Sequence, residues 1–130
     1  MIYRTCSDIV KAVEHQSSLN VGGSKSRLNY CTAWIIKPEF SDFLILQSYS
    51  TIVAAYQFST GILWVFGYYS STTASHIAKF RNWITYEYQA GLYYPRTVKL
   101  YNDSRTGKRA AQKNLDDDFA SVISTAINQR

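Results

Sequence analysis

Residues that form disulfides, metal sites and membrane spans are scarce in this sequence. Only two cysteines, Cys6 and Cys31, occur in 130 residues. A disulfide scaffold requires more, and a structural zinc site requires paired ligands about two to four residues apart. We therefore expect two reduced thiols. No apolar run reaches the roughly 18 to 20 residues of a membrane span, and the first residues contain no signal-peptide apolar region. These absences predict a cytoplasmic protein that makes no membrane contact.

The residues of common catalytic motifs are scarce too. Only six acidic residues occur before residue 114, and this scarcity disfavours a two-carboxylate hydrolase or nuclease. The two histidines, His15 and His76, lie in no metal-ligand pattern, and no Gly-x-Ser-x-Gly motif accompanies them. The segment Gly22-Gly23-Ser24-Lys25 lacks the spacing of a phosphate-binding loop. We therefore expect neither catalytic activity nor a bound cofactor or metal.

Aromatic residues, in contrast, are abundant. Three tryptophans, eleven tyrosines and six phenylalanines make up 15% of the chain. Because tyrosine combines an apolar ring with a polar hydroxyl, it suits half-buried sheet positions and also partner contacts. Both interpretations stay open. The chain is 46% apolar and 18% charged, which is typical of a globular protein, and its length predicts one domain over residues 1–130.

Positive charge is concentrated in one part of the chain. The net charge is +5, but residues 79–113 contain eight basic and two acidic residues, which gives this segment a charge of +6. Such clustering is typical of a surface that meets nucleic acid or an acidic protein face, and a solvated face is the alternative. A mimic of DNA would be acidic, so this chain does not imitate a phosphate backbone.

Hydrophobic periodicity predicts an α+β domain. We expect an antiparallel sheet of four or five strands, a helix after the central hairpin, and helices near both termini. Continuous apolar runs at residues 44–46 and 62–66 predict strands that are covered on both faces. The expected helices are Thr5–Gln16, Ala74–Tyr88 and one starting at Asn114, and the expected strands are Leu28–Ile36, Phe43–Tyr49, Thr51–Gln57, Ile62–Tyr68 and the edge strand Thr97–Tyr101.

The expected helix over residues 74–88 should cover one sheet face. Thr72 and Thr73 are its expected caps, and Phe80 should be buried against the hairpin strands. His76 lies on the flank of the apolar stripe, which favours a histidine on the helix surface or at an interface over a functional one.

In the C-terminal helix, three consecutive aspartates occupy the first turn, where they complement the helix dipole. Interaction with the helix dipole is favoured over a metal site for Asp116, Asp117 and Asp118, because neighbouring side chains on a helix point in different directions.

Two segments resemble a known pattern. They are SYSTIVA at residues 48–54 and GYYSSTTASHIAKF at residues 67–80. Together they are similar to the pattern S-Y-x-T-x-V-A followed by Y-S-x-T-T-x-x-H-I-x-K-F, found in small uncharacterised proteins of bacteriophages and prophages. The hydroxyls of the second segment are suited to capping a helix, so the pattern is explained first as structure.

The resemblance implies a phage-encoded protein in the cytoplasm of an infected or lysogenic bacterial host. Small phage accessory proteins commonly bind a host machine and block or redirect it, so we expect an inhibitor of a defence system such as a CRISPR nuclease. The alternative is a basic, tyrosine-rich nucleic-acid-binding module. An exposed edge strand or aromatic patch would also allow a homodimer. The expected partner-binding residues are Lys79, Arg81, Tyr93, Tyr94, Arg96, Lys99, Tyr101, Arg105, Lys108, Arg109 and Lys113.

Overall fold

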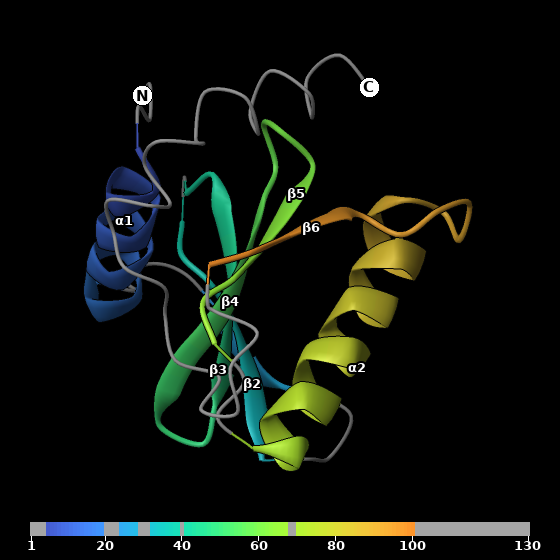
Figure 1. Ribbon diagram of the computed structural model, residues 1–130, viewed down its shortest axis with the longest axis horizontal. Coiled ribbons are helices and arrows are strands. Elements are labelled where there is room, and N and C mark those ends of the chain that lie inside the picture. Colours follow the sequence, from blue (N-terminus) through green and yellow to red (C-terminus); the bar gives the residue numbers. More distant parts are fainter. Residues whose placement is uncertain (1–4, 20–23, 29–31, 40, 68–69, 101–130) are drawn as a thin grey trace.

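The computed structural model describes residues 5–19, 24–28, 32–39, 41–67 and 70–100. Within these ranges two helices flank a six-stranded sheet, one on each side (Figure 1). The elements are α1 (Cys6–Leu19), β1 (Ser24–Arg27), β2 (Ala33–Lys37), β3 (Phe43–Ser48), β4 (Thr51–Gln57), β5 (Ile62–Val65), α2 (Ser71–Tyr88) and β6 (Arg96–Lys99). The α+β class is therefore confirmed. The expected helix from Asn114, with its three aspartates, and Cys31 lie outside the described residues.

The strands lie in the sheet in the order in which they occur in the sequence. Strands β1 to β5 pair antiparallel, whereas β5 and β6 pair parallel. The expectation of an antiparallel sheet with four or five strands is thus wrong in two respects. Helix α2 connects β5 to β6 and returns the chain to the end of the sheet at which β5 begins. Strand β6 must therefore run in the same direction as β5. Strand β6 forms an edge of the sheet, as the sequence predicted.

The additional strand, β1, precedes the segment that was expected to form the first strand. The expected strand over residues 28–36 is wrong at its start: β2 begins at Ala33, and Leu28 donates its backbone N–H to the carbonyl of Ala33 (2.9 Å), which closes the hairpin between β1 and β2. Strand β1 has the sequence SKSR, and all four of its side chains are exposed. A strand with no buried face has no apolar alternation from which it can be recognised.

The sheet buries both of its faces. Alternate side chains of β3 point to opposite sides. Ile45 joins the cluster that α1 covers with Ile9 and Val13, whereas Leu46 joins the cluster that α2 covers with Phe80 and Ile84. The predictions that the central strands are covered on both faces and that Phe80 is buried are therefore confirmed.

Each helix begins at a side-chain cap. In α1, Thr5 and Asp8 form a reciprocal capping box: the Asp8 N–H donates to Thr5 Oγ1 (3.1 Å), and the Thr5 N–H donates to Asp8 Oδ2 (3.2 Å). In α2 the cap is Ser70, whose Oγ accepts from the Thr73 N–H (3.1 Å). The expectation that Thr72 and Thr73 cap this helix is wrong, because the helix already begins at Ser71 and both threonines lie inside its first turn.

Candidate functional site

The site is built where α2 ends. The N–H groups of Gln89 and Gly91 both donate to the carbonyl of Thr85 (3.1 and 2.9 Å), and Leu92 donates to Gln89 (3.0 Å). Ala90 and Gly91 adopt left-handed φ angles of 55° and 76°. This is a common way to terminate a helix. The chain then reverses and passes through residues 92–95 toward β6.

An aromatic cluster fixes this end of the helix to the sheet. The ring of Tyr88 lies 6.0 Å from Tyr56, 5.3 Å from Phe58 and 5.8 Å from Trp83, measured between centroids. Gln89 also donates from Nε2 to the Tyr56 hydroxyl (2.9 Å). Ring contacts of this kind contribute about 0.5–1.5 kcal/mol each beyond their buried area. The helix end and the turn after it therefore form a rigid platform.

Large apolar side chains on this platform face solvent. The exposed fractions are 74% for Tyr86, 78% for Leu92, 63% for Tyr93 and 56% for Tyr94. Single exposed apolar residues are ordinary, but several together mark a site of interaction. The reversal at Gly91 lies against Tyr86, since a Cβ on Gly91 would be 3.4 Å from the Tyr86 ring, and the other three residues follow Gly91 directly in the chain.

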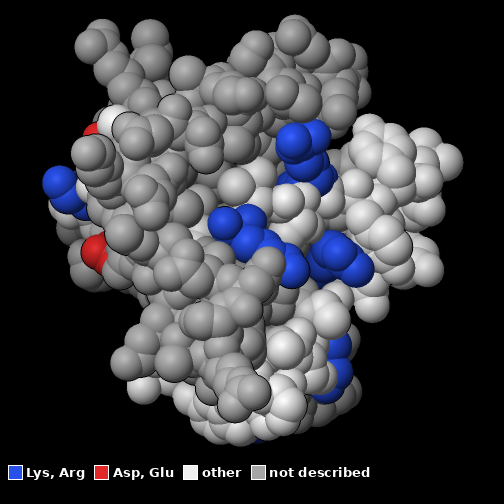
Figure 2. Space-filling model, viewed as in Figure 1, with Lys and Arg blue, Asp and Glu red and all other residues white. Residues whose placement is uncertain are grey.

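Basic side chains adjoin these rings. The guanidinium of Arg81 lies over the Tyr94 ring, 4.6 Å from its centroid, in a cation–π contact. Arg96 and Lys99 are exposed on β6. Figure 2 shows Lys and Arg side chains around the region where β6 passes α2, with no acidic side chain visible among them. Hereafter the aromatic–basic surface means Tyr86, Leu92, Tyr93, Tyr94, Arg81 and Arg96.

Six of the eleven expected partner-binding residues are described. Arg81 and Tyr94 are in contact, Tyr93 is exposed beside them, Arg96 and Lys99 lie on β6, and half-buried Lys79 is on α2. The other five lie outside the described residues: Tyr101, Arg105, Lys108, Arg109 and Lys113.

Tyr86 and Leu92 were missed by the sequence analysis. Tyr86 lies off the apolar stripe of α2, where a large ring has no core to enter, and that pattern alone marks it as exposed.

His76 belongs to a buried polar cluster. Its Nδ1 lies 2.8 Å from Ser48 Oγ, and Ser48 Oγ lies 3.2 Å from Thr73 Oγ1, which also accepts from Ser70 Oγ (3.2 Å). Ser48 and His76 are each 2% exposed. The expectation of a surface or interface histidine is therefore wrong. Thr73, His76 and Phe80 follow helical spacing, so the buried face of α2 extends through the histidine.

The chemistry of this cluster is structural. Burial lowers the pKa of His76 below its ordinary value, and the nearby charge of Lys79 lowers it further, so the ring is held neutral. A serine beside a histidine suggests a nucleophile and its base, but a nucleophile must reach its substrate, and Ser48 Oγ is enclosed. Instead, the cluster ties the end of β3 to the start of α2. The segments 48–54 and 67–80 meet here, since Ser48 comes from the first and Thr73 and His76 come from the second.

The described part of the chain provides no cluster of three or more histidine, cysteine or acidic residues that would hold a metal ion. Neither α1 nor α2 is long and apolar enough to cross a membrane.

Comparison with protein families identifies a family for this chain. A model described as "Family of unknown function (DUF8033)" matches residues 9–90, which extend from the first turn of α1 to just past the end of α2. The match covers more than half of the chain, so the protein belongs to this family. Searches of curated proteins and of solved structures found no match.

Proposed function

We propose that this chain is a binding protein without catalytic activity, which docks on a host protein or nucleoprotein through the aromatic–basic surface. The observation that supports this function is the group of four large apolar side chains, each more than half exposed, on a rigid helix end beside a stacked arginine. Tyrosine and arginine are enriched among residues that dominate binding energy. A tyrosine on a rigid backbone loses little conformational entropy on binding, so the platform is suited to this role.

The finer proposal is a phage-encoded inhibitor that blocks or redirects a host defence system such as a CRISPR nuclease. Its support is the resemblance of residues 48–54 and 67–80 to phage and prophage proteins, which is an argument by analogy. Because Ser48, Thr73 and His76 are buried together, the pattern accounts for how α2 is attached to the sheet. The contact with the target is therefore assigned to the aromatic–basic surface, outside the pattern.

A second candidate is binding of single-stranded nucleic acid. It is favoured by the pairing of Arg81 with Tyr94 next to exposed Tyr93, since stacking rings beside cations form a common platform for unpaired bases. In this function Arg96 and Lys99 would contact phosphates.

Affinity capture from bacterial host lysate tests the first proposal. Wild-type protein is compared with a Tyr86→Ser/Tyr93→Ser double variant, with and without nuclease treatment. The matched control is Tyr49→Asn, which removes a 52% exposed tyrosine that lies next to His76, toward the other end of α2. Asparagine is chosen because it tolerates the positive φ of position 49. We expect one discrete partner, resistant to nuclease, that the control retains and the double variant loses. Equal capture by all three proteins would refute the assignment of the surface.

The inhibitor proposal has its own test. In cells with a CRISPR nuclease directed against a plasmid, the wild-type protein should restore plasmid transformation and the Tyr86→Ser/Tyr93→Ser variant should not. If the wild-type protein restores transformation with none of the representative nuclease types, a CRISPR nuclease is not the target. The docking surface would then still be tested by the capture experiment.

A further inference from the structure

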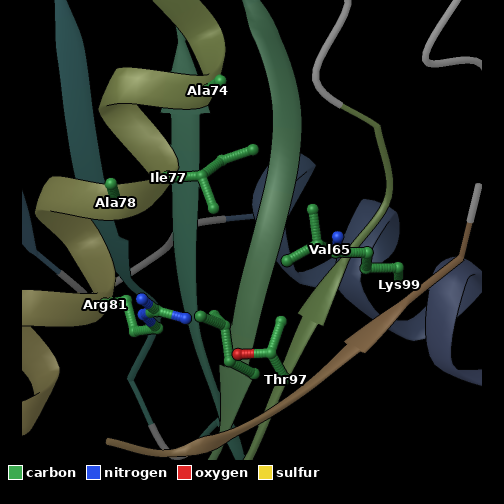
Figure 3. Close-up of a pocket in the computed structure, with 8 residues that line it drawn as sticks. Val65, Ala74, Ile77, Ala78, Arg81, Thr97 and Lys99 are labelled. Atoms are coloured by element: carbon green, nitrogen blue, oxygen red, sulfur yellow. The ribbon is translucent and has the colours of Figure 1, made fainter. Parts of the chain in front are cut away.

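A cavity of about 210 Å³ lies between α2 and the edge of the sheet formed by β5 and β6 (Figure 3). Its apolar lining comes from Leu63 and Val65 of β5 and from Ala74, Ile77 and Ala78 of α2. Ala74 and Ala78 are four residues apart and so lie one turn above the other on the same face of the helix. Because alanine is small at both positions, α2 does not fill the space above the strand edge.

Polar groups enter the cavity from two elements. Arg81 reaches in from α2, and Lys99 and Thr97 line it from β6. In Figure 3 the guanidinium of Arg81 and the side chain of Lys99 approach the cavity from opposite sides, with Thr97 closer to Arg81. The lining is thus apolar over most of its area and cationic at two places. Ligand pockets commonly combine a hydrocarbon wall with a few oriented polar groups.

Arg81 has an unsatisfied donor here. Its Nε is buried and has no hydrogen-bond partner among the residues that the structure describes. The Tyr94 ring covers the guanidinium at 4.6 Å but accepts no conventional hydrogen bond from Nε. A buried donor without an acceptor costs about 1–3 kcal/mol, and more when the group is charged. An oxyanion that pairs with this guanidinium and comes within reach of Nε would reduce this cost.

We infer that the cavity binds a small carboxylate that carries an apolar group. An apolar cavity of about 150 Å³ accommodates benzene, so one of 210 Å³ has room for a ring or short hydrocarbon chain with one carboxylate. The hydrocarbon part packs on Leu63, Val65 and Ile77, and the carboxylate accepts from Arg81. Carboxylate is assigned in preference to phosphate because one guanidinium pairs well with two carboxylate oxygens, whereas a dianion would leave further charge against an apolar wall. This site does not rest on the proposed docking function.

Titration of the full chain with benzoate, followed by amide NMR, tests the inference. A ligand of this size is expected to bind with a Kd of about 1 mM or tighter. Benzoate should shift the amide signals of residues 74–81 and 96–99. Benzamide has the same shape without the charge and should bind at least about tenfold more weakly, because a charge-assisted hydrogen bond is lost. Phenyl phosphate should also bind more weakly than benzoate.

Two pairs of variants locate the site. Arg81→Gln should weaken benzoate binding by about tenfold or more. Lys11→Gln removes the same charge from an exposed position of α1, on the other side of the sheet, and should leave binding unchanged. Ala78→Leu should fill the cavity and abolish binding, whereas Ser75→Leu places the same side chain on an exposed helix position outside the lining and should not.

Several results would overturn the inference. They are no shift with benzoate at several times the expected Kd, equal binding of benzamide, tighter binding of phenyl phosphate, or benzoate affinity that Ala78→Leu leaves unchanged. The amide spectrum of each variant reports its folding. If Arg81→Gln does not fold, the benzamide comparison and the Ala78→Leu/Ser75→Leu pair still decide the outcome.

Discussion

Replacing Ser48 with alanine tests the role of the buried polar cluster. The change removes the oxygen that lies 2.8 Å from His76 Nδ1 and 3.2 Å from Thr73 Oγ1. Thr73 retains its contact with Ser70 (3.2 Å), whereas His76 Nδ1 loses the contact made by Ser48. Leaving one buried polar group unsatisfied costs about 1–3 kcal/mol, so we expect the free energy of unfolding to fall by that amount.

The same cluster should make stability depend on pH. The pKa of His76 is lowered in the folded protein from its ordinary value of 6.5, by burial first and by Lys79 second. The unfolded chain therefore binds a proton more readily than the folded one. The resulting stabilisation is complete above about pH 6.5 and is lost as the pH falls toward the lowered pKa, with a slope of at most about 1.4 kcal/mol per pH unit.

Urea unfolding between about pH 7.5 and about pH 5.5, above the range in which most carboxylates titrate, measures both effects. His76→Asn keeps a nitrogen near the position of Nδ1 without a titrating ring, so its stability should change less with pH than that of the wild type. The reasoning is refuted if His76→Asn shows the full wild-type pH dependence, or if Ser48→Ala unfolds at the wild-type urea concentration at pH 7.5.

Two further predictions concern the core and the basic residues. Phe80→Ala should lower the free energy of unfolding by about 3–5 kcal/mol, which is the range for a truncated core aromatic. The control Tyr86→Ala, on the exposed face of the same helix, should change it by less than about 0.5 kcal/mol. A wild-type urea midpoint for Phe80→Ala would contradict the packing of α2 on the sheet. If Arg96 and Lys99 contact phosphates, binding of a single-stranded probe should weaken with salt with a log–log slope of about −1.4. Absence of a gel shift at low salt would favour the protein partner.

The central part of the fold was predictable because its sequence patterns are strong. The continuous apolar runs in β3 and β5 indicate burial on both faces, and Phe80 and Ile84 indicate the face of α2 that packs. The end of α2 also follows from Gly91, because glycine adopts a left-handed φ without strain and commonly terminates a helix.

The rest of the fold and of the site depends on contacts between residues far apart in the sequence, which a local sequence pattern does not reveal. Strand β1 has no apolar face, so only its pairing with β2 reveals it. The parallel pairing of β6 is set by the path of α2 across the sheet. The prediction of an exposed His76 failed because a histidine is usually assigned to a surface. The hydrogen-bonding partner that allows its burial, Ser48, lies 28 residues earlier in the sequence. The stacking of Arg81 on Tyr94 likewise requires the reversal after Gly91.

Site-specific photocrosslinking at Tyr93 tests the proposed docking surface most directly. A photoreactive phenylalanine derivative at this exposed position is nearly isosteric with tyrosine, and the control carries the same group at exposed Lys11 on α1. In irradiated host cells we expect one discrete adduct from position 93, absent from position 11 and weakened by Tyr86→Ser. No adduct from position 93, or the same adducts from both positions, would contradict a binding function located at the end of α2.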